Sequence, residues 1–404
     1  MISVADALAK VLAGIRPVAA EQVALTDGLG RVLAEDVAAR LSHPPAAVSA
    51  MDGYAVRAAD VAAVPATLKI IGESSAGRGF AGPIAKGEAA RIFTGAPIPE
   101  GADCIAIQED CDAGDGAVTV KETVKAGKWV RPAGLDFSLG EVLLETGRVL
   151  TARDVGLAAA MNVPWLMVKR RPRVAIIATG DEVVMPGDPL GPDQIVSSNS
   201  VAIAAYVKAL GGEPVNLGIA RDTVESLTAL LAGVRGADLL VTTGGASVGD
   251  YDLIKQVLGS EGLELGFYKI AMRPGKPLIF GRLGDVPVLG LPGNPVSTGV
   301  CSAIFLKPAM EKMLAIRAKD RPAQSAVLGR DLPENDKRAE YMRATLSFAP
   351  DGTRIATPFD KQDSAMLAKF SHADCLVFRP ALAPPAKKGE RVEILMLGEG
   401  IVRF

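Results

Sequence analysis

The stretch ADLLVTTGGASVGDYD, residues 237–252, decides the fold. It begins with three apolar residues, Leu239 to Val241, a run that is typical of a strand buried on both faces. Small residues, two glycines and two acids follow, and a segment of helical character runs from Leu253 to Leu258. This order predicts one βα unit of an open α/β sheet, in which ligands bind at the carboxyl ends of the strands.

The turn inside this stretch offers main-chain N–H groups to an anion. Glycines and other small residues let the backbone approach a ligand closely, as in turns that hold phosphate. The residues concerned are Thr243, Gly244, Gly245, Ser247 and Gly249. The carboxylates of Asp250 and Asp252 indicate a divalent cation, because a carboxylate and a phosphate repel each other without one. The alternative interpretation is an ordinary tight βα loop.

The same pattern recurs on both sides of this stretch. A strand at Val174–Ala178 leads into Asp181 and Glu182, and a strand at Val286–Leu289 leads into the stiff turn of Pro292, Gly293, Asn294 and Pro295. Helices are expected at 200–210, at 223–234 and from about Pro295 to Ile316. Strands that alternate with helices predict a doubly wound, mostly parallel sheet. The turns after Thr179, Thr242 and Leu291 are expected to face one crevice.

The remaining sequence predicts further domains, since 404 residues are too many for one core. Residues 41–136 contain short β-type runs separated by glycine and proline, and residues 321–404 contain a second such series. We therefore expect a multidomain α/β plus β protein. Residues 1–40 and 137–172 form a helical and extended linker domain, residues 41–136 an inserted β module, 173–320 the α/β domain and 321–404 a β-barrel-like domain. Helices are expected at Ser3–Ile15 and Leu29–Glu35.

Composition excludes several classes of function. The net charge of −2 gives no global attraction to nucleic acid or to an anionic membrane, and no apolar run is long enough to span a bilayer. Four cysteines without paired spacing indicate a reduced, cytoplasmic chain, and the N-terminal segment does not have the pattern of a signal peptide. Two histidines make a histidine-rich zinc site very improbable and leave no general base for a serine nucleophile.

A loop with three cations and an acidic pair add charged side chains that suit the binding of an anion and of a metal ion. Lys269, Arg273 and Lys276 lie in one loop that prolines stiffen, and such a loop holds an oxyanion through charge-assisted hydrogen bonds. A solvated basic turn is the alternative. The acidic pair Asp181-Glu182 either ligates Mg²⁺ or only favours the start of a helix. The residues alone thus predict Mg²⁺-assisted handling of a phosphate compound or another oxyanion.

Six motifs resemble one family in order and spacing. They are MDGYAV (51–56), TGAPIPEGAD (94–103), TGDE (179–182), TTGGASVGDYD (242–252), MRPGKP (272–277) and LPGNPVS (291–297). Together they resemble molybdopterin molybdenumtransferase, the MoeA and gephyrin E-domain family, along essentially the whole chain. The resemblance implies an elongated homodimer that acts on adenylylated molybdopterin and molybdate, releases AMP with the help of Mg²⁺, and works beside other proteins of molybdenum cofactor biosynthesis.

The resemblance also implies roles for individual residues. The site would lie between the α/β domain of one subunit and the inserted β module of the other, which contributes Asp52, Thr94 and Asp136. Glu182 and Asp252 would hold the metal, and Pro292 and Pro295 would shape the molybdate pocket. The implied catalytic residues are Asp52, Glu182, Asp252, Lys269 and Arg273. The implied substrate-binding residues are Thr94, Asp136, Thr243, Gly244, Gly245, Ser247, Gly249, Asp250, Lys276, Pro292, Asn294 and Pro295.

The chain departs from the family pattern at two places, and two other functions stay open. Arg273 stands where some relatives have lysine, and Gln362-Asp363-Ser364 stands where relatives often have a Gly-Ser-His-like stretch. One alternative is adenylylation of molybdopterin by ATP, which would release pyrophosphate. The other is a non-enzymatic scaffold like gephyrin, which is expected to have a further fused domain and a long linker.

Overall fold

A six-stranded sheet forms the centre of the α/β unit, in the order β16-β13-β17-β21-β20-β18. The first four strands are parallel, and β20 and β18 extend the sheet as an antiparallel pair. This computed structural model describes residues 1–244, 263–317 and 324–398. The strands and helices of the unit are β13 (Arg173–Thr179), β14 (Val183–Val184), β15 (Ile195–Val196), α3 (Asn199–Ala209), β16 (Glu213–Ala220), α4 (Val224–Leu231), β17 (Leu239–Thr243), β18 (Leu263–Lys269), β20 (Pro277–Leu283), β21 (Val286–Leu291), α6 (Pro295–Cys301) and α7 (Lys307–Met313).

Helices cover both faces of this sheet, as a doubly wound fold requires. Alternate residues of each strand point to opposite faces, so that Ile176 and Val241 pack with α3, α6 and α7 while Ile177 and Leu240 pack with α4. The long helix expected from Pro295 is interrupted, because a π-helical turn at Ser302–Leu306 joins α6 to α7. The predicted fold class is confirmed.

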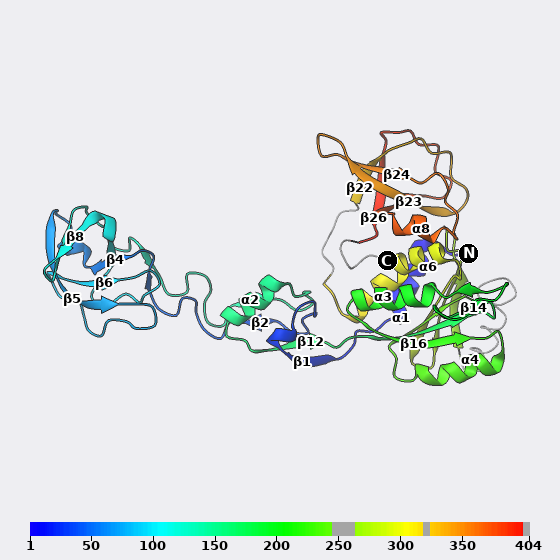
Figure 1. The fold of residues 1–404 in the computed structure, drawn as a ribbon, viewed down its shortest axis with the longest axis horizontal. Helices are drawn as coiled ribbons and strands as arrows, with labels where there is room; N and C mark the ends of the chain where they lie inside the picture. The colour runs from blue at the N-terminus through cyan, green and yellow to red at the C-terminus, as the bar shows by residue number, and fades with distance from the viewer. Residues whose placement is uncertain (245–262, 318–323, 399–404) are drawn as a thin grey trace.

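The helix α1 (Val4–Gly14) packs on the α/β sheet, whereas the sequence analysis grouped it with residues 137–172. Ser3 caps the helix by accepting a hydrogen bond from the Asp6 N–H, and Ala7 and Val11 lie in the sheet's core. A Cβ atom at Gly14 would lie 2.6 Å from the Phe280 ring, so the contact is tight. The N-terminus therefore lies beside the α/β unit, far from residues 20–40 (Figure 1).

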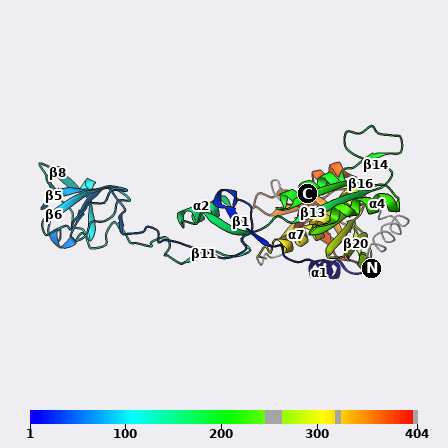
Figure 2. The same ribbon diagram turned by 90° about the horizontal axis from the view of Figure 1, so that it is seen from below.

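An arm and a β module extend from this unit (Figures 1 and 2). In the arm, β1 pairs with β12 and β2 with β11, and helix α2 packs on them over a core of its own. The module is a six-stranded sheet in the order β7-β4-β6-β5-β9-β8, with β3 and β10 paired beside it. Their bounds are β1 (Ala20–Ala24), β2 (Val37–Ala38), β3 (Val48–Ser49), β4 (Gly53–Val56), β5 (Ala66–Ser74), β6 (Glu88–Ile92), β7 (Cys104–Ile107), β8 (Cys111–Gly114), β9 (Ala117–Val120), β10 (Val130–Arg131), β11 (Val142–Leu144), α2 (Ala152–Ala160) and β12 (Trp165–Lys169).

The helix expected at Leu29–Glu35 is wrong. Val32 and Leu33 form single bridges to Val149 and Val168 and are buried in the arm. A 3₁₀ turn at Leu25–Asp27 precedes them. Pairing with distant strands outweighs the weak local helical preference of this short segment.

The C-terminal unit is a closed five-stranded barrel. Its strands follow the order β23-β24-β22-β26-β25, and β25 returns to pair with β23. The short β19 joins the outside of β23, which links the barrel to the loop of the α/β unit. The bounds are β19 (Met272–Arg273), β22 (Gln324–Leu328), β23 (Ala339–Phe348), β24 (Arg354–Pro358), α8 (Leu367–Ser371), β25 (Cys375–Arg379) and β26 (Arg391–Met396). Within the described ranges, no helix is both long and apolar enough to cross a membrane.

Candidate active site

The strand ends of the α/β sheet bring the predicted turns together. Thr243 at the end of β17 lies opposite Ala178 of β13 on one side and Leu291 of β21 on the other. Because these strands are parallel, Glu182, Gly244 and Pro292 follow them at the same edge. The end of β18 lies at this edge too, since Lys269 is paired with Pro277 at the start of the antiparallel β20. The three turns and the basic loop thus meet at one edge of the sheet.

Gly244 is required by its backbone and by its neighbours. Its φ is +94°, and a Cβ atom there would lie 2.3 Å from the carbonyl oxygen of Thr179. A Cβ at Gly293 would lie 3.4 Å from the Gly244 Cα, so the turns after β17 and β21 are in close contact. The other predicted residues of this turn, Gly245, Ser247, Gly249, Asp250 and Asp252, lie outside the described residues.

Asn199, the first residue of α3, joins two of these turns, and the sequence analysis missed it. Its Nδ2 donates to Thr243 Oγ1 at 3.0 Å and to the Gly293 carbonyl oxygen at 2.6 Å. Thr298 Oγ1 donates to the carbonyl oxygen of Pro292 at 2.6 Å from within α6. Only the polar run before α3 marks Asn199 in the sequence, and such runs are common at helix starts.

The loop at Asn294 also contacts the C-terminal unit. Asn294 Nδ2 donates to Ser364 Oγ at 2.9 Å, and the Val296 N–H donates to the Ser364 carbonyl oxygen at 3.1 Å. Pro295 occupies the first turn of α6, where its missing N–H removes no helical hydrogen bond. The barrel therefore helps to hold the turn that was predicted to bind molybdate.

The two acidic residues after β13, Asp181 and Glu182, have different surroundings. Asp181 Oδ1 accepts a hydrogen bond from the Asp222 N–H at 3.1 Å, which ties the loop to the end of β16. Glu182 is exposed, and its carboxylate lies over Gly180, where a Cβ would be 2.5 Å from Glu182 Oε2. A single carboxylate at a phosphate site suits Mg²⁺, which takes one or two carboxylates beside phosphate and water oxygens. No group of three or more acidic, histidine or cysteine side chains gathers as a metal site within the described ranges.

The three cations of the basic loop have different surroundings. Lys269 and Lys276 are exposed, and Lys269 Nζ lies 4.6 Å from the centre of the Tyr268 ring. Arg273 instead donates from Nε and Nη2 to Glu340 Oε1 of the barrel, at 2.9 and 2.6 Å. The hydrogen bond to Glu340 raises the pKa of Arg273. The structure thus places the two lysines at the sheet edge, whereas Arg273 is paired with the carboxylate of Glu340 in the barrel.

Asp52 and Thr94 are in direct contact in the inserted module. Asp52 Oδ1 accepts hydrogen bonds from the Thr94 N–H at 2.7 Å and from Thr94 Oγ1 at 2.8 Å. These bonds, the backbone one first, lower the pKa of the Asp52 carboxyl, and the positive charge of Arg91 adds to the effect. The guanidinium of Arg91, a residue that sequence reasoning missed, stacks on Tyr54 and Phe93 and donates to the Gly53 carbonyl oxygen.

Asp136 lines a groove in the same module. The groove has a volume of about 640 Å³ and runs past Gly95, the neighbour of Thr94, and past Arg131 and His43. The Asp136 N–H donates to the His43 carbonyl oxygen at 2.9 Å, which fixes the loop. Asp52, Thr94 and Asp136, the three predicted residues of the module, therefore lie at one end of the module.

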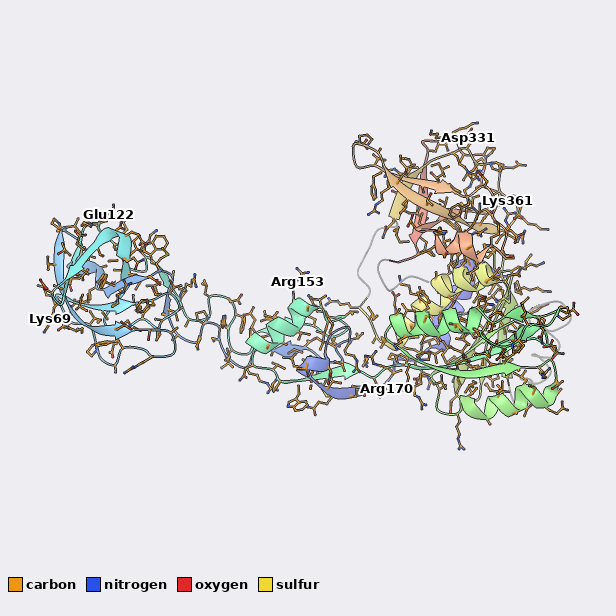
Figure 3. The ribbon with its side chains drawn as sticks, in the orientation of Figure 1. Lys69, Glu122, Arg153, Arg170, Asp331 and Lys361 are labelled. Carbon is orange, nitrogen blue, oxygen red and sulfur yellow. The ribbon has the colours of Figure 1, made fainter. Side chains whose placement is uncertain are left out.

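The two groups of residues lie at opposite ends of the elongated molecule. The module is separated from the α/β unit by the whole length of the arm, in both views (Figures 1 and 2). Arg170 lies where the arm joins the α/β unit (Figure 3), and its guanidinium donates to both carboxylate oxygens of Asp238 at 2.7 and 2.6 Å. This bidentate pair and the Arg173 N–H, which donates to the same carboxylate, fix the direction of the arm. One chain does not bring the module residues to the sheet edge.

Comparison with known proteins gives matches along the whole chain. Residues 2–162 match the MoeA N-terminal region (domain I and II), 175–312 a probable molybdopterin binding domain, and 325–397 the MoeA C-terminal region (domain IV). Molybdopterin molybdenumtransferase 2 of Mycobacterium tuberculosis is 38% identical over 84% of this chain and 85% of its own length. The molybdopterin molybdenumtransferase of Haemophilus influenzae is 33% identical over 98% of both chains.

A solved structure agrees with these sequence matches. The crystal structure of a molybdopterin biosynthesis MoeA protein from Pyrococcus horikosii superposes with a TM-score of 0.88 at 33% identity, over 99% of this chain and 100% of that one. Identity above 30% along nearly the full length of several relatives indicates membership of one family and not only a shared fold. With its three matched regions in order, this chain belongs to the MoeA family of molybdopterin molybdenumtransferases.

Proposed function

We propose that this chain transfers molybdenum from molybdate to adenylylated molybdopterin. In this reaction the phosphoanhydride is cleaved, AMP leaves, and molybdenum is placed on the dithiolene sulfurs. The observation that carries the proposal is the meeting of the glycine turn, the basic loop and the Pro292 turn at one sheet edge, in a chain whose relatives are named molybdopterin molybdenumtransferases over most of its length. Such an edge is where α/β sheets bind phosphate compounds.

The residues at this edge have distinct tasks in the proposal. Main-chain N–H groups of the turn after Thr243 and the ammonium groups of Lys269 and Lys276 bind the phosphates. The turn of Pro292, Asn294 and Pro295 holds molybdate. Glu182, together with Asp252, would hold Mg²⁺, which would neutralise charge on the phosphoanhydride as it is cleaved.

The module residues enter the proposed site from a second copy of the chain. The module that contains Asp52, Thr94 and Asp136 lies at the far end of the arm from the sheet edge of its own subunit (Figure 1). An antiparallel pairing of two elongated chains with two-fold symmetry brings each module to the partner's sheet edge and gives two equal sites. This arrangement makes the homodimer a condition of activity.

Product analysis tests the function. Purified protein is mixed with adenylylated molybdopterin, Mg²⁺ and low molybdate, and AMP release and reconstitution of an apo-molybdoenzyme are followed. We expect both signals to require molybdate. AMP release that does not respond to molybdate, without reconstitution, contradicts the proposal, and consumption of ATP with release of pyrophosphate would indicate the adenylylation step.

Two variants test the assignment of residues. Asp52→Ala and Lys269→Ala should each lower the rate of AMP release at least about a hundredfold. Lys269→Ala removes a cation that binds the phosphates, and Asp52→Ala removes the carboxylate that the module contributes to the site. Lys208→Ala, an exposed lysine of α3 away from the basic loop, is the matched control and should retain the activity. Full activity in both Asp52→Ala and Lys269→Ala would show that the site lies elsewhere.

A further inference from the structure

A pocket at one end of the C-terminal barrel contains only Arg273 of the active-site residues that the sequence resemblance implies. It has a volume of about 290 Å³. Strands β23 and β25 contribute Glu340 and Arg379, which lie directly opposite each other. The rest of the wall comes mainly from the segment between β22 and β23. The lining residues that matter below are Arg273, Arg330, Glu334, Glu340, Asp360 and Arg379.

Arg379 is a buried cation without a carboxylate partner in the described part of the chain. Its residue is only 4% exposed. Nη2 donates to the carbonyl oxygens of Pro333, Ala383 and Pro384, which holds the guanidinium in place. Nη1 is buried and has no acceptor among the described residues. A buried charge that lacks both a counter-charge and a full set of hydrogen bonds is unfavourable, so the arrangement favours an anion beside it.

Arg330 provides a second donor on the same wall. Its Nη1 pairs with Asp360, and its Nη2 donates to the Phe359 carbonyl oxygen at 3.1 Å. Its Nε is buried and likewise has no acceptor within the described ranges. Two guanidinium groups held by the fold therefore each leave one N–H group without a protein acceptor at one pocket, and planar N–H donors of this kind suit an oxyanion.

The surrounding charges favour a singly charged ligand over a more highly charged one. Glu340 is paired with Arg273, and Asp360 is paired with Arg330, so that these four groups balance. Arg379 and the exposed Glu334 are the two charged residues of the lining without an ion pair in the described ranges, so the lining has no net positive charge. A doubly charged anion would be repelled by the three carboxylates of the wall.

We propose that this pocket binds a singly charged oxyanion of the carboxylate class, with Arg379 Nη1 and Arg330 Nε as donors. The proposal is independent of the reaction proposed above, because both proposed donors, Arg379 and Arg330, belong to the barrel. Asp331 and Lys361, which mark the barrel's outer surface in Figure 3, lie well away from the arm and the module. The occupied pocket would lie beside Arg273 and would stabilise the barrel against unfolding.

The thermal midpoint of barrel unfolding in the full chain, followed by hydrogen exchange of peptides from β23 and β25, tests this site with acetate as the probe. Acetate replaces chloride at pH 7 and constant ionic strength, and the rise in midpoint gives an apparent Kd. We expect a saturable rise with acetate and a weaker one with sulfate. Arg379→Gln and Arg330→Gln should each raise the apparent Kd about tenfold, the loss expected for one charge-assisted hydrogen bond. Arg354→Gln, an exposed arginine of β24 outside the pocket, should leave the Kd unchanged.

Two outcomes overturn the proposal. The first is a midpoint that does not distinguish acetate from chloride in the unsubstituted protein. The second is an equal Kd in Arg330→Gln and Arg354→Gln. Because Arg330 is partly exposed, Arg330→Gln is expected to fold. It therefore tests the site even where Arg379→Gln fails to fold. A crystal grown with acetate gives an independent result, since electron density for water alone at Arg379 Nη1 would also contradict the site.

Discussion

Asp52 carries its negative charge because Thr94 donates two hydrogen bonds to one carboxylate oxygen. We predict that Thr94→Val raises the pKa of Asp52 towards its ordinary value of 3.8 but not fully, because the backbone N–H bond, the larger cause of the lowered pKa, remains. Titration of the chain with ¹³C-labelled aspartate carboxyl groups measures this shift by NMR. An unchanged pKa would show that the side-chain bond does not form.

The lowered pKa also sets the pH range in which Asp52 contributes to stability. The carboxyl is a stronger acid in the folded protein, so its contribution is fully present above 3.8 and is lost as the pH falls through the lower folded value. Thr94→Val should therefore make the folded module slightly less resistant to acid below pH 4. Thr119→Val provides the control, because Thr119 is a half-buried threonine of β9 in the same module whose hydroxyl contacts Thr67 and not a carboxylate.

The contact between Asp52 and Thr94 could not be derived from the sequence alone. The two residues are 42 positions apart, and they meet because β4 and β6 pair with Gly53 opposite Ile92. The sequence shows two glycine-containing turns, but it does not contain the register of that pair. The resemblance to a family placed both residues in one site. The contact itself, and the stacking of Arg91 beside it, required the structure.

At the scale of elements, Gly244 connects the strand ends that form the candidate site. We predict that Gly244→Ala destabilises the α/β sheet by about 2 kcal/mol or more, because the residue has φ +94° and the added Cβ would meet backbone at 2.3 Å. Gly352→Ala is the matched control, with φ +83° and open space around the Cβ position. The Gly352→Ala substitution should lower the free energy of unfolding by only about 1 kcal/mol.

Hydrogen–deuterium exchange of peptides from β13 and β17 measures this prediction locally, since the chain has several units and does not unfold in one step. Faster exchange there in Gly244→Ala than in Gly352→Ala is the expected result. Equal exchange in the two variants would mean that the turn tolerates a side chain.

The sequence predicted strands and helices well where a pattern was long and buried. The strands β13, β17 and β21 and the helices α1 and α3 follow from their apolar patterns. The prediction failed at Leu29–Glu35, where pairing with residues more than a hundred positions away decides the structure. It also could not show that α1 packs on the α/β sheet, because its apolar stripe suits any core.

At the scale of the whole molecule, the arm keeps the two halves of the candidate site apart. The bidentate pair of Arg170 and Asp238 and the separate core of the arm make this separation a property of the fold (Figure 3). The homodimer follows from this geometry as a proposal, since a second copy is the simplest way to unite Asp52 with Lys269. Domain count and composition could indicate several units, but they contain no information on the distance between them.

Mixing two inactive variants tests the shared site most directly. Asp52→Ala and Lys269→Ala chains are unfolded, mixed in equal amounts and refolded together, and molybdate-dependent AMP release is measured. Half of the refolded dimers then contain one chain of each variant, and each such mixed dimer has one of its two sites intact. A site shared between two subunits therefore predicts about a quarter of the activity of the unsubstituted protein. Activity no higher than that of either variant alone, in a mixture shown to contain mixed dimers, would place both residues in one subunit's site and contradict the account.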